Sequence, residues 1–318
     1  MTAIVPMGAE NFVGGDWGTS HLRLFLCDAQ GAVLDSRTGP GAVDASGHFS
    51  DVFESLVAHW EESLGTLRAA LCGMVGSSIG WTPVPYIACP AIPDQIADAC
   101  VALRGGAVHI IPGLSCRNRF NAPDFLRGEE TQILGALQLA PVLRQGRWLL
   151  CLPGTHTKWA VLADGSVREF LSAPTGELFA VLCDHSVLAG RRGPVETTID
   201  AEAFKEGLAC FNAFPHAQLL HRLFECRSRQ LSGELGAPEA RAYLSGLLIA
   251  SDVHGALLEL SSSIETRLVY VIGSSDLTPL YATALASHGY ETVQVEGAAA
   301  SRAGLAQVHR RLSQGGGA

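Results

Sequence analysis

The chain has 318 residues, 47% of them hydrophobic, and a formal net charge of −9, which gives enough apolar material for about two domain cores. No apolar run approaches the roughly 20 residues of a membrane-spanning helix, and no basic cluster beyond the Arg191–Arg192 pair indicates a nucleic-acid groove. The start, Met1–Asn11, lacks the basic and apolar stretches of a signal peptide, so we expect a short disordered extension on a cytoplasmic protein without membrane or nucleic-acid partners.

The first predicted element is a hairpin that recurs later in the chain. Gly14–Gly31 and Leu150–Gly165 each contain a Gly-Thr pair, an apolar-rich strand and an Asp-Gly turn. The step from the glycine of the Gly-Thr pair to the aspartate of the turn is ten residues in both segments. A chance match in a Gly-rich chain is one explanation, and a duplicated domain with one hairpin in each half is the other.

The rest of the chain alternates helical and strand patterns. Each hairpin leads into a further strand, over 32–36 and over 166–171. In chain order, the other predicted elements are a helix over 52–64, a strand over 67–74, a helix over 131–143, a helix over 240–260, a strand over 268–272, a helix over 278–287, a strand over 292–295 and a helix over 300–312. Such alternation predicts an α/β fold with a mixed or parallel sheet covered by helices.

Nine cysteines are scattered along these elements. Their number is odd, and neither a CxxC pair nor the Cys/His spacing of a zinc site occurs. Most lie in apolar surroundings, where cysteine behaves as a small buried hydrophobe. We therefore expect reduced thiols with a structural role.

A Gly-Thr turn can bind phosphate, because glycine allows successive N–H groups to point at one anion. In the first hairpin, Thr19 and Ser20 add hydroxyl donors. Asp16 would repel phosphate directly, so its expected partner is a hydrated Mg²⁺ on a nucleotide. A single segment of this kind is more often an ordinary hairpin with an exposed aspartate, whereas two of them indicate a phosphate site.

The segment Arg127–Gln132 offers a carboxylate of the kind that positions an attacking hydroxyl in phosphoryl transfer. It also begins a predicted helix, where the helix dipole favours glutamate for purely structural reasons. Glu129 and Glu130 are adjacent and project in different directions. One of them could therefore point into a cleft while the other is solvated.

Three further loops follow predicted strands or the second hairpin. Gly73–Trp81 is a Gly/Ser-rich loop that either holds a substrate or is a plain surface loop. Thr175–Glu177 is either a helix start or a substrate contact. Gly273–Ser275 resembles a nucleotide-contacting turn but lacks the G-x-G-x-x-G spacing of a dinucleotide fold.

Taken together, these segments resemble the 2-dehydro-3-deoxygalactonokinase family, a branch of the sugar-kinase, Hsp70 and actin superfamily. The matching stretches occur in family order and are Asp16–Ser20, Gly73–Ser77 with Gly80–Trp81, Ile111–Leu114, Arg127–Gln132, Pro153–Trp159, Thr175–Leu178 and Tyr243–Ile249. The Arg127–Gln132 and Pro153–Trp159 stretches are long enough to be specific, and the whole set spans most of the chain.

The resemblance implies two ribonuclease-H-like domains closing over ATP·Mg²⁺ in a nucleotide cleft. We expect the first domain over 12–136, with the terminal helix 300–312 as a candidate addition, and the second over 137–299. It also implies phosphorylation of 2-dehydro-3-deoxy-D-galactonate at its 6-hydroxyl, a step in galactonate breakdown. A homodimer is a candidate assembly. The preferred keto-deoxy sugar acid depends on pocket shape, which the sequence does not reveal.

By analogy with the superfamily, the resemblance also implies roles for single residues. The expected cofactor-binding residues are Asp16, which would also carry the metal, Gly18, Thr19, Ser20, Gly154, Thr155, His156, Gly273 and Ser274. Glu130, or else Glu129, is the expected general base, like a glutamate in the similar segment of exopolyphosphatases. Lys158 either neutralises charge on the transferred group or is a strand-face residue with a solvated amine. The candidates for substrate binding are Arg23, Gly76, Ser77, Trp81, Arg127 and Glu177.

The chain departs from the superfamily at two positions. Leu152 stands where many members have Asp, so metal binding should depend on Asp16, and Ser274 stands where many have a second Gly, which puts the adenine contacts in doubt. Two alternative functions share these motifs. A hydrolase of the same superfamily would cleave polyphosphate or a nucleotide without any sugar acid, and an actin-like ATP-binding protein would assemble and turn over slowly.

Overall fold

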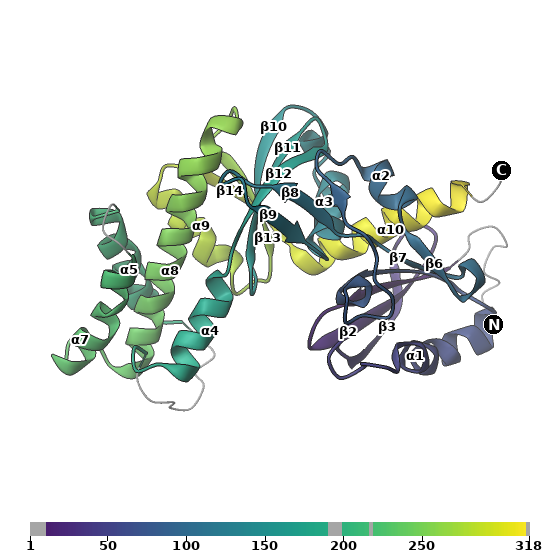
Figure 1. Ribbon diagram of the computed structural model, residues 1–318, viewed down its shortest axis with the longest axis horizontal. Coiled ribbons are helices and arrows are strands. Elements are labelled where there is room, and N and C mark those ends of the chain that lie inside the picture. Colours follow the sequence, from purple (N-terminus) through teal and green to yellow (C-terminus); the bar gives the residue numbers. More distant parts are fainter. Residues whose placement is uncertain (1–10, 190–198, 216–218, 316–318) are drawn as a thin grey trace, which may run out of the picture. The chain divides into compact units, whose positions relative to one another are not determined.

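The computed structural model describes residues 11–189, 199–215 and 219–315 (Figure 1). The predicted extension, apart from Asn11, and the Arg191–Arg192 pair lie outside these ranges. The chain divides into two compact units. Unit 1 comprises Met1–Gly146, Leu162–Phe170 and Val295–Ala318, and unit 2 comprises Arg147–Val161 and Leu171–Gln294. The division into domains over 12–136 and 137–299 stays a prediction.

Unit 1 is built on a six-stranded sheet in the order β3-β2-β1-β4-β7-β6. Its strands are β1 (Phe12–Trp17), β2 (His21–Cys27), β3 (Val33–Pro40), β4 (Arg68–Gly73), β6 (Val101–Leu103) and β7 (Val108–Ile110). β2 is antiparallel to β1 and β3, whereas β4 is parallel to β1 and β7 is parallel to β4. In β2, buried Leu22 and Leu24 alternate with exposed His21 and Arg23, which is the period of a strand with one face on the core.

Within the residues that the structure describes, unit 1 also contains a small sheet and four α-helices. A small sheet has the order β5-β8-β9 and consists of β5 (Ile87–Ala88), β8 (Leu114–Arg117) and β9 (Pro123–Leu126). The helices are α1 (Phe49–Leu64), α2 (Pro93–Asp98), α3 (Glu129–Leu139) and α10 (Gly297–Gly315). The helix predicted over 131–143 is α3, which ends at Leu139 because Pro141 disfavours helical backbone before it. Pro141–Arg144 form a separate 3₁₀ turn.

Helices α3 and α10 lie side by side in unit 1 (Figure 1). They approach so closely that two glycines are required at the contact. A Cβ atom added to Gly135 of α3 would lie 1.7 Å from the Ala300 carbonyl oxygen. One added to Gly304 of α10 would lie 1.9 Å from the Thr131 carbonyl oxygen. The spacing of these helices therefore excludes any larger residue at either position.

The five-stranded sheet has the order β12-β11-β10-β13-β14. Its strands are β10 (Arg147–Leu152), β11 (Thr157–Ala163), β12 (Ser166–Ala173), β13 (Leu268–Gly273) and β14 (Glu291–Glu296), with β10 parallel to β13. The order third, second, first, fourth, fifth repeats that of β3-β2-β1-β4-β7, and it is the strand order of ribonuclease-H-like domains. The predicted α/β class is confirmed, and the repeated order supports duplication over a chance match of the hairpins.

Unit 2 is rich in helices, of which α8 is the central one. They are α4 (Thr175–His185), α5 (Ala201–Ala213), α6 (Leu219–Leu223), α7 (Glu225–Leu231), α8 (Ala237–Leu260) and α9 (Thr278–Ser287). The segment Ala237–Ser263 is long and apolar enough to cross a membrane by length and composition. However, 61% of its most apolar window is buried within the protein, as expected of a core helix.

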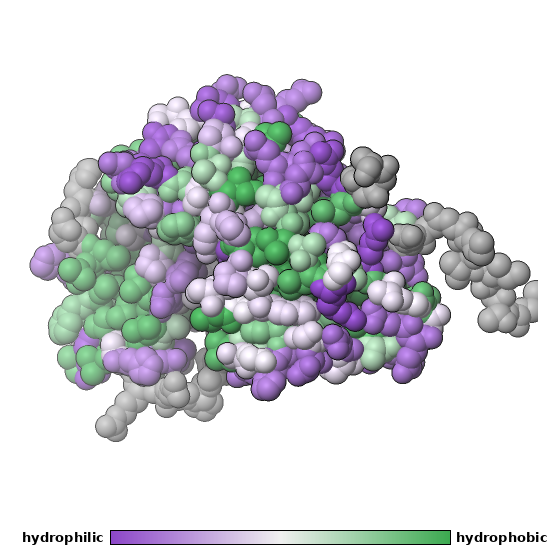
Figure 2. All heavy atoms as spheres, turned by 45° about the vertical axis from the view of Figure 1, so that its right-hand side comes forward, coloured by the Kyte–Doolittle hydropathy of each residue, from purple (hydrophilic) through white to green (hydrophobic). Residues whose placement is uncertain are grey.

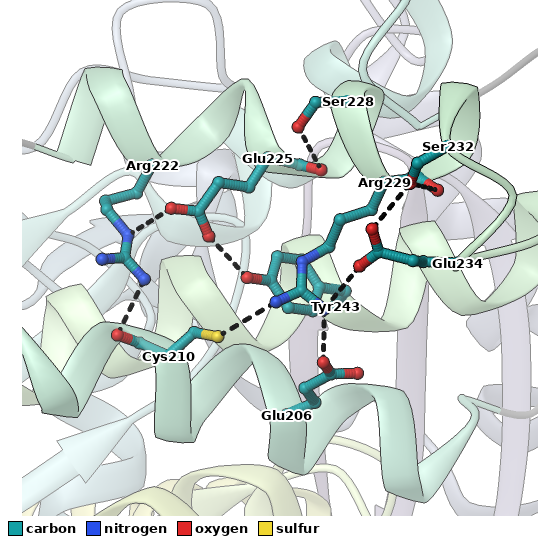
Figure 3. Close-up of polar contacts among 9 residues, drawn as sticks. All are labelled: Glu206, Cys210, Arg222, Glu225, Ser228, Arg229, Ser232, Glu234 and Tyr243. Atoms are coloured by element: carbon teal, nitrogen blue, oxygen red, sulfur yellow. Dashed lines mark hydrogen bonds and ion pairs between the residues drawn. The ribbon is translucent and has the colours of Figure 1, made fainter.

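Polar contacts tie the outer helices of unit 2 to α8 (Figure 3). The hydroxyl of Tyr243 in α8 donates to Glu225 of α7 at 2.6 Å, and Arg222 of α6 pairs with the same carboxylate at 2.8 Å. The guanidinium of Arg229 stacks on the Tyr243 ring at 4.9 Å and pairs with Glu206 of α5. These contacts form a structural cluster that joins four helices.

Hydrophobic residues also reach the surface, where Figure 2 shows them interspersed with hydrophilic ones. In unit 2, the side chains of Phe214, Leu220, Phe224 and Leu231 are 58–80% exposed.

All nine cysteines lie in described residues and are free thiols. The predicted homodimer stays a prediction.

The α3–α10 contact predicts that Gly135→Ala and Gly304→Ala destabilise the protein by about 1–3 kcal/mol or more, because overpacking forces the helices apart. Gly255→Ala is the matched control, since Gly255 lies in α8 and its added Cβ would meet nothing within 4 Å. There, alanine should stabilise the helix by about 0.5–1 kcal/mol. Urea denaturation followed by circular dichroism measures the free energy of unfolding of all three variants. Equal effects at the contact and at Gly255 would contradict the close approach.

Candidate functional site

The first Gly-Thr turn joins β1 to β2 in unit 1. The Gly18 N–H donates to the His21 carbonyl oxygen at 2.9 Å, which closes the turn. Thr19 and Ser20 are exposed at its tip. A second backbone segment supports the turn from behind, because a Cβ atom on Gly41 would lie 2.3 Å from the Thr19 carbonyl oxygen. The turn is therefore held in place while its two hydroxyl side chains remain accessible.

Asp16 precedes this turn at the end of β1, where Arg23 of β2 is its partner in register. Burial raises the pKa of the Asp16 carboxyl, and the positive charge of Arg23 lowers it. Gly73, at the end of β4, has a φ of 88°, and its added Cβ would lie 3.5 Å from Asp16 Oδ1. The structure thus brings the predicted residues Asp16 and Arg23 together beside the strand end that begins the Gly/Ser loop.

The glutamate pair begins α3 after a glycine with a φ of 104°, Gly128. The Gly128 N–H donates to Glu130 Oε2 at 2.6 Å, and the Thr131 hydroxyl donates to Oε1 at 2.8 Å. Glu130 is completely buried. Burial, together with the negative charge of Glu129, raises its pKa to about 8. At neutral pH, Glu130 is therefore mostly protonated and enclosed by the protein.

Glu129 lies in a different environment from its neighbour. It is only partly buried, and its Oε2 accepts a hydrogen bond from the Arg127 N–H at 3.0 Å. The pair lies close to Asp16, because a Cβ on Gly128 would be 3.6 Å from the Cα of Gly73, the residue beside the Asp16 carboxylate. Of the two glutamates, Glu129 has the accessibility that a general base requires.

Arg127 and Gly76 are also brought together in unit 1. The Arg127 guanidinium donates from Nη2 to the Val84 carbonyl oxygen at 2.8 Å and stacks on the Tyr86 ring at 4.3 Å. Its Nη1 is buried without a hydrogen-bond partner, and a Cβ on Gly76 would lie 2.6 Å from this atom. An unpaired guanidinium nitrogen is a site where an anion would be stabilised.

Two other predicted substrate residues have local structural contacts. The Trp81 ring packs against those of Phe53 and Trp17, with centroids 5.7 and 6.4 Å apart. The Ser77 hydroxyl accepts a hydrogen bond from the Ile79 N–H at 3.3 Å. These contacts shape the loop after β4, and a direct role of either residue in substrate binding stays a prediction.

In unit 2, the second Gly-Thr turn joins β10 to β11 and packs against the start of α4. A Cβ on Gly176 would lie 2.3 Å from the Gly154 carbonyl oxygen, so only glycine fits there. The Glu177 N–H donates to the Thr155 carbonyl oxygen at 2.9 Å. The Glu177 carboxylate bonds to His156 Nε2 at 2.7 Å. The side chains of His156 and Glu177 are both about half exposed. These contacts bring the predicted residues Thr155, His156 and Glu177 together at this turn.

Lys158 and the predicted adenosine segment flank the same turn. The Lys158 side chain is buried, and its Nζ donates to the Ser172 hydroxyl of β12 at 2.7 Å. The amine of Lys158 is thus buried, which differs from the solvated amine expected of a strand-face residue. A Cβ on Gly273 would lie 3.5 Å from Pro153 Cδ, so the end of β13 is beside the turn. The Ser274 carbonyl oxygen accepts hydrogen bonds from the N–H groups of Leu277 and Thr278 at the start of α9.

A pocket of about 420 Å³ opens beside the second turn within unit 2. It is lined by Gly154, Thr175, Gly176, Phe179, Ile199, Ser245, Leu248, Ile249, Leu277 and Tyr281. Most of these residues were not predicted as site residues. The Thr175–Leu178 and Tyr243–Ile249 stretches carried a signal because they matched the family. Leu277 and Tyr281 lie two and six residues after Ser275 and carried none.

Within the described residues, no group of three or more His, Cys, Asp or Glu side chains is placed to hold a metal ion. Asp16 precedes the first Gly-Thr turn, and its register partners, Arg23 in β2 and Cys72 in β4, are not carboxylates. Mg²⁺ is often held by one or two carboxylates together with substrate phosphates and water. The donor set at Asp16 suits that mode and does not suit an all-protein metal cage.

Comparison with known proteins identifies the family of this chain. The sequence model of the 2-keto-3-deoxy-galactonokinase family matches residues 16–308. The chain belongs to this family. It is 37% identical to a probable 2-dehydro-3-deoxygalactonokinase of Rhizobium meliloti, over 96% of this chain and 98% of that protein. It is 30% identical to the 2-dehydro-3-deoxygalactonokinase of Escherichia coli, over 93% and 97%. The family resemblance predicted from the motifs is confirmed.

Solved structures extend the comparison to the fold. A Sinorhizobium meliloti protein assigned as a 2-dehydro-3-deoxygalactonokinase superposes with a TM-score of 0.85 and 35% identity, covering 94% of this chain and 98% of that one. The activator of 2-hydroxyisocaproyl-CoA dehydratase from Clostridium difficile, solved with ADPNP, has a TM-score of 0.51 at 12% identity, covering 96% and 97%. The second likeness concerns the fold alone.

The buried Glu130 carboxyl predicts a pH dependence of stability. Its pKa in the folded protein is about 8, well above that of an unfolded glutamate, so the folded state retains a proton that the unfolded state releases. Stability from this group is therefore present at low pH and is lost as pH rises from about 5 to about 8, by up to about 1.4 kcal/mol per pH unit. Glu130→Gln should remove this dependence. Urea denaturation of the wild type and of Glu130→Gln at several pH values from about 5 to about 8 measures the free energy of unfolding. Parallel pH profiles of the two proteins would contradict the raised pKa of Glu130.

Proposed function

We propose that the protein is an ATP-dependent kinase that phosphorylates 2-dehydro-3-deoxy-D-galactonate at its 6-hydroxyl in galactonate breakdown. The observation that carries the proposal is family membership over residues 16–308, together with a partly exposed carboxylate beside the Asp16 turn. We also propose a cytoplasmic location, where ATP is available. The preference among keto-deoxy sugar acids depends on the shape of the substrate pocket.

The nucleotide is assigned to the two Gly-Thr turns. The hydroxyls of Thr19 and Ser20 in unit 1 and of Thr155 in unit 2 would donate to phosphate oxygens, with nearby backbone N–H groups. The largely apolar pocket beside Gly154 suits a nucleotide base, and Leu277 and Tyr281 line it. Mg²⁺, when bound, would neutralise phosphate charge, and Asp16 is the residue that would hold it through water.

The sugar acid is assigned to unit 1. The unpaired Nη1 of Arg127 supports this guanidinium as a partner for the substrate carboxylate, and Arg23, the register partner of Asp16, is a second candidate cation in the same unit. Because Nη1 is buried against Gly76, its engagement requires a small opening of the loop that follows β4. The carboxylate distinguishes a sugar acid from a neutral sugar, so this contact would set the class of acceptor.

The transfer step follows from these assignments. Glu129 accepts the proton of the 6-hydroxyl as the hydroxyl oxygen forms a bond to the terminal phosphorus of ATP. The bond from that phosphorus to the bridging oxygen of ADP breaks, and ADP leaves with the electron pair. Glu130 is unsuited to accept this proton, because it is buried and already protonated at neutral pH. Lys158 stays a candidate for neutralising charge on the transferred group.

An acceptor panel tests the proposal against its two rivals. ADP release should require both Mg²⁺ and a 2-keto-3-deoxy sugar acid, and it should be much slower with aldonic acids that lack the keto-deoxy pattern or with neutral aldoses. Phosphate release from ATP or polyphosphate without any acceptor would favour a hydrolase. Filament formation with ATP and no acceptor dependence would favour an actin-like protein. A coupled ADP assay and light scattering measure these outcomes.

The base assignment predicts a large difference between two neighbouring variants. Glu129→Gln should lower kcat by about 10²- to 10⁴-fold, the usual loss on removing a general base, while KM for ATP stays near that of the wild type. Glu130→Gln is the matched control, since it removes the adjacent carboxyl without removing the base, and it should retain most of kcat. The reverse pattern in steady-state kinetics would return the role to Glu130.

A further inference from the structure

Asp252, in the middle of α8, receives hydrogen bonds from three separate elements of unit 2. The Trp159 indole N–H of β11 donates to Oδ1 at 2.8 Å. The Thr175 hydroxyl at the start of α4 donates to Oδ2 at 2.6 Å, and the Tyr281 hydroxyl of α9 donates to the same oxygen at 2.7 Å. One carboxylate therefore joins a strand and two helices to the central helix.

A third hydroxyl extends this network to the first residue of β11. Thr157 Oγ1 and the Tyr281 hydroxyl oxygen are 2.6 Å apart and buried. Because the Tyr281 hydroxyl donates to Asp252, it accepts from Thr157 in turn. The strand that leaves the second Gly-Thr turn is thus fixed at Thr157 through Tyr281 and at Trp159 directly.

The same carboxylate also fixes the helix that packs on the other side of the turn. Thr175 is followed by Gly176, whose close contact with the Gly154 carbonyl oxygen leaves no room for a Cβ. Glu177 then donates its N–H to the Thr155 carbonyl oxygen at 2.9 Å. A displacement of Thr175 would therefore move the backbone that holds Gly154 and Thr155.

We infer that Asp252 is a positioning residue for nucleotide binding, which sets the conformation of the Gly154–Thr155 turn and the side of the adjoining pocket formed by Thr175 and Tyr281. Asp252 itself is not among the residues that line the pocket, so its effect is transmitted through the groups it binds. This inference rests on the proposed function of the second turn as a phosphate-binding element. The ligand class is a nucleoside di- or triphosphate.

Three hydrogen bonds to one carboxylate are also what a purely structural cluster would show, so a matched control is required. Glu225 provides one in the same unit, because its carboxylate accepts from the Tyr243 hydroxyl and pairs with Arg222 (Figure 3). It joins α7 to α8 as Asp252 joins its neighbours, and none of its contacts reaches the second turn. Glu225→Gln and Asp252→Asn thus make the same chemical change in two different places.

The test compares the full-length variants with the wild type. Titration calorimetry measures MgADP binding, and steady-state kinetics gives KM for ATP and for the sugar acid. Asp252→Asn should weaken MgADP binding and raise KM for ATP by about 10- to 100-fold, the usual cost of removing a residue that orients a binding group. KM for the sugar acid should stay near that of the wild type. Glu225→Gln should lower the melting temperature without altering either nucleotide parameter.

Thr175→Val gives a second measurement if Asp252→Asn fails to fold, because valine has the shape of threonine and removes only the hydroxyl bonded to Asp252. It should weaken MgADP binding, and Thr175→Ser should recover most of the loss. Unchanged MgADP binding in the soluble Asp252 and Thr175→Val variants would overturn the inference, as would an equal loss in Glu225→Gln. Because MgADP binding needs no acceptor, a wild type that binds nucleotide but phosphorylates no sugar acid would refute the proposed function and leave this inference standing.

Discussion

The close approach of backbone segments around α3 is the constraint on which the candidate site of unit 1 depends. Gly135 and Gly304 allow the backbones of α3 and α10 to come into contact at two positions. That contact fixes where α3 begins, and the left-handed backbone at Gly128 turns the chain into the helix. Glu129 is the first residue after this turn, so the position of the proposed base follows from glycines that never touch a ligand.

The same arrangement places two adjacent carboxyl groups in different environments. Glu130 is removed from water, and its burial is compensated by hydrogen bonds from the Gly128 N–H and the Thr131 hydroxyl rather than by a cation. A neutral carboxyl is the less costly form there, which accounts for its raised pKa. Glu129 keeps contact with solvent. Two carboxyl groups in environments as different as these can serve different roles, one structural and one catalytic.

Much of the fold could be predicted from periodicity and turn residues, and the contacts between elements could not. The hairpins, β13 and α9 follow from local patterns, and α9 was predicted with its observed bounds. Helix α5 was missed although Asp200 caps it and its buried residues follow helical spacing. The pocket residues Leu277 and Tyr281 and the network at Asp252 depend on distant segments meeting in three dimensions. The family could be predicted because its motifs are ordered and long.

The duplicated turns have diverged in a way that separates charge from apolar surface. Asp16 lies two residues before Gly18 in unit 1, and Leu152 occupies the corresponding position before Gly154 in unit 2, where it is buried. A second carboxylate at Leu152 would carry charge next to the apolar pocket and would add repulsion against a phosphate at the same turn. Unit 2 instead keeps its carboxylate at Asp252, behind the turn, where three donors satisfy it. The repeat thus retains one topology, and the proposed function assigns the metal-bearing turn to unit 1 and the apolar base pocket to unit 2.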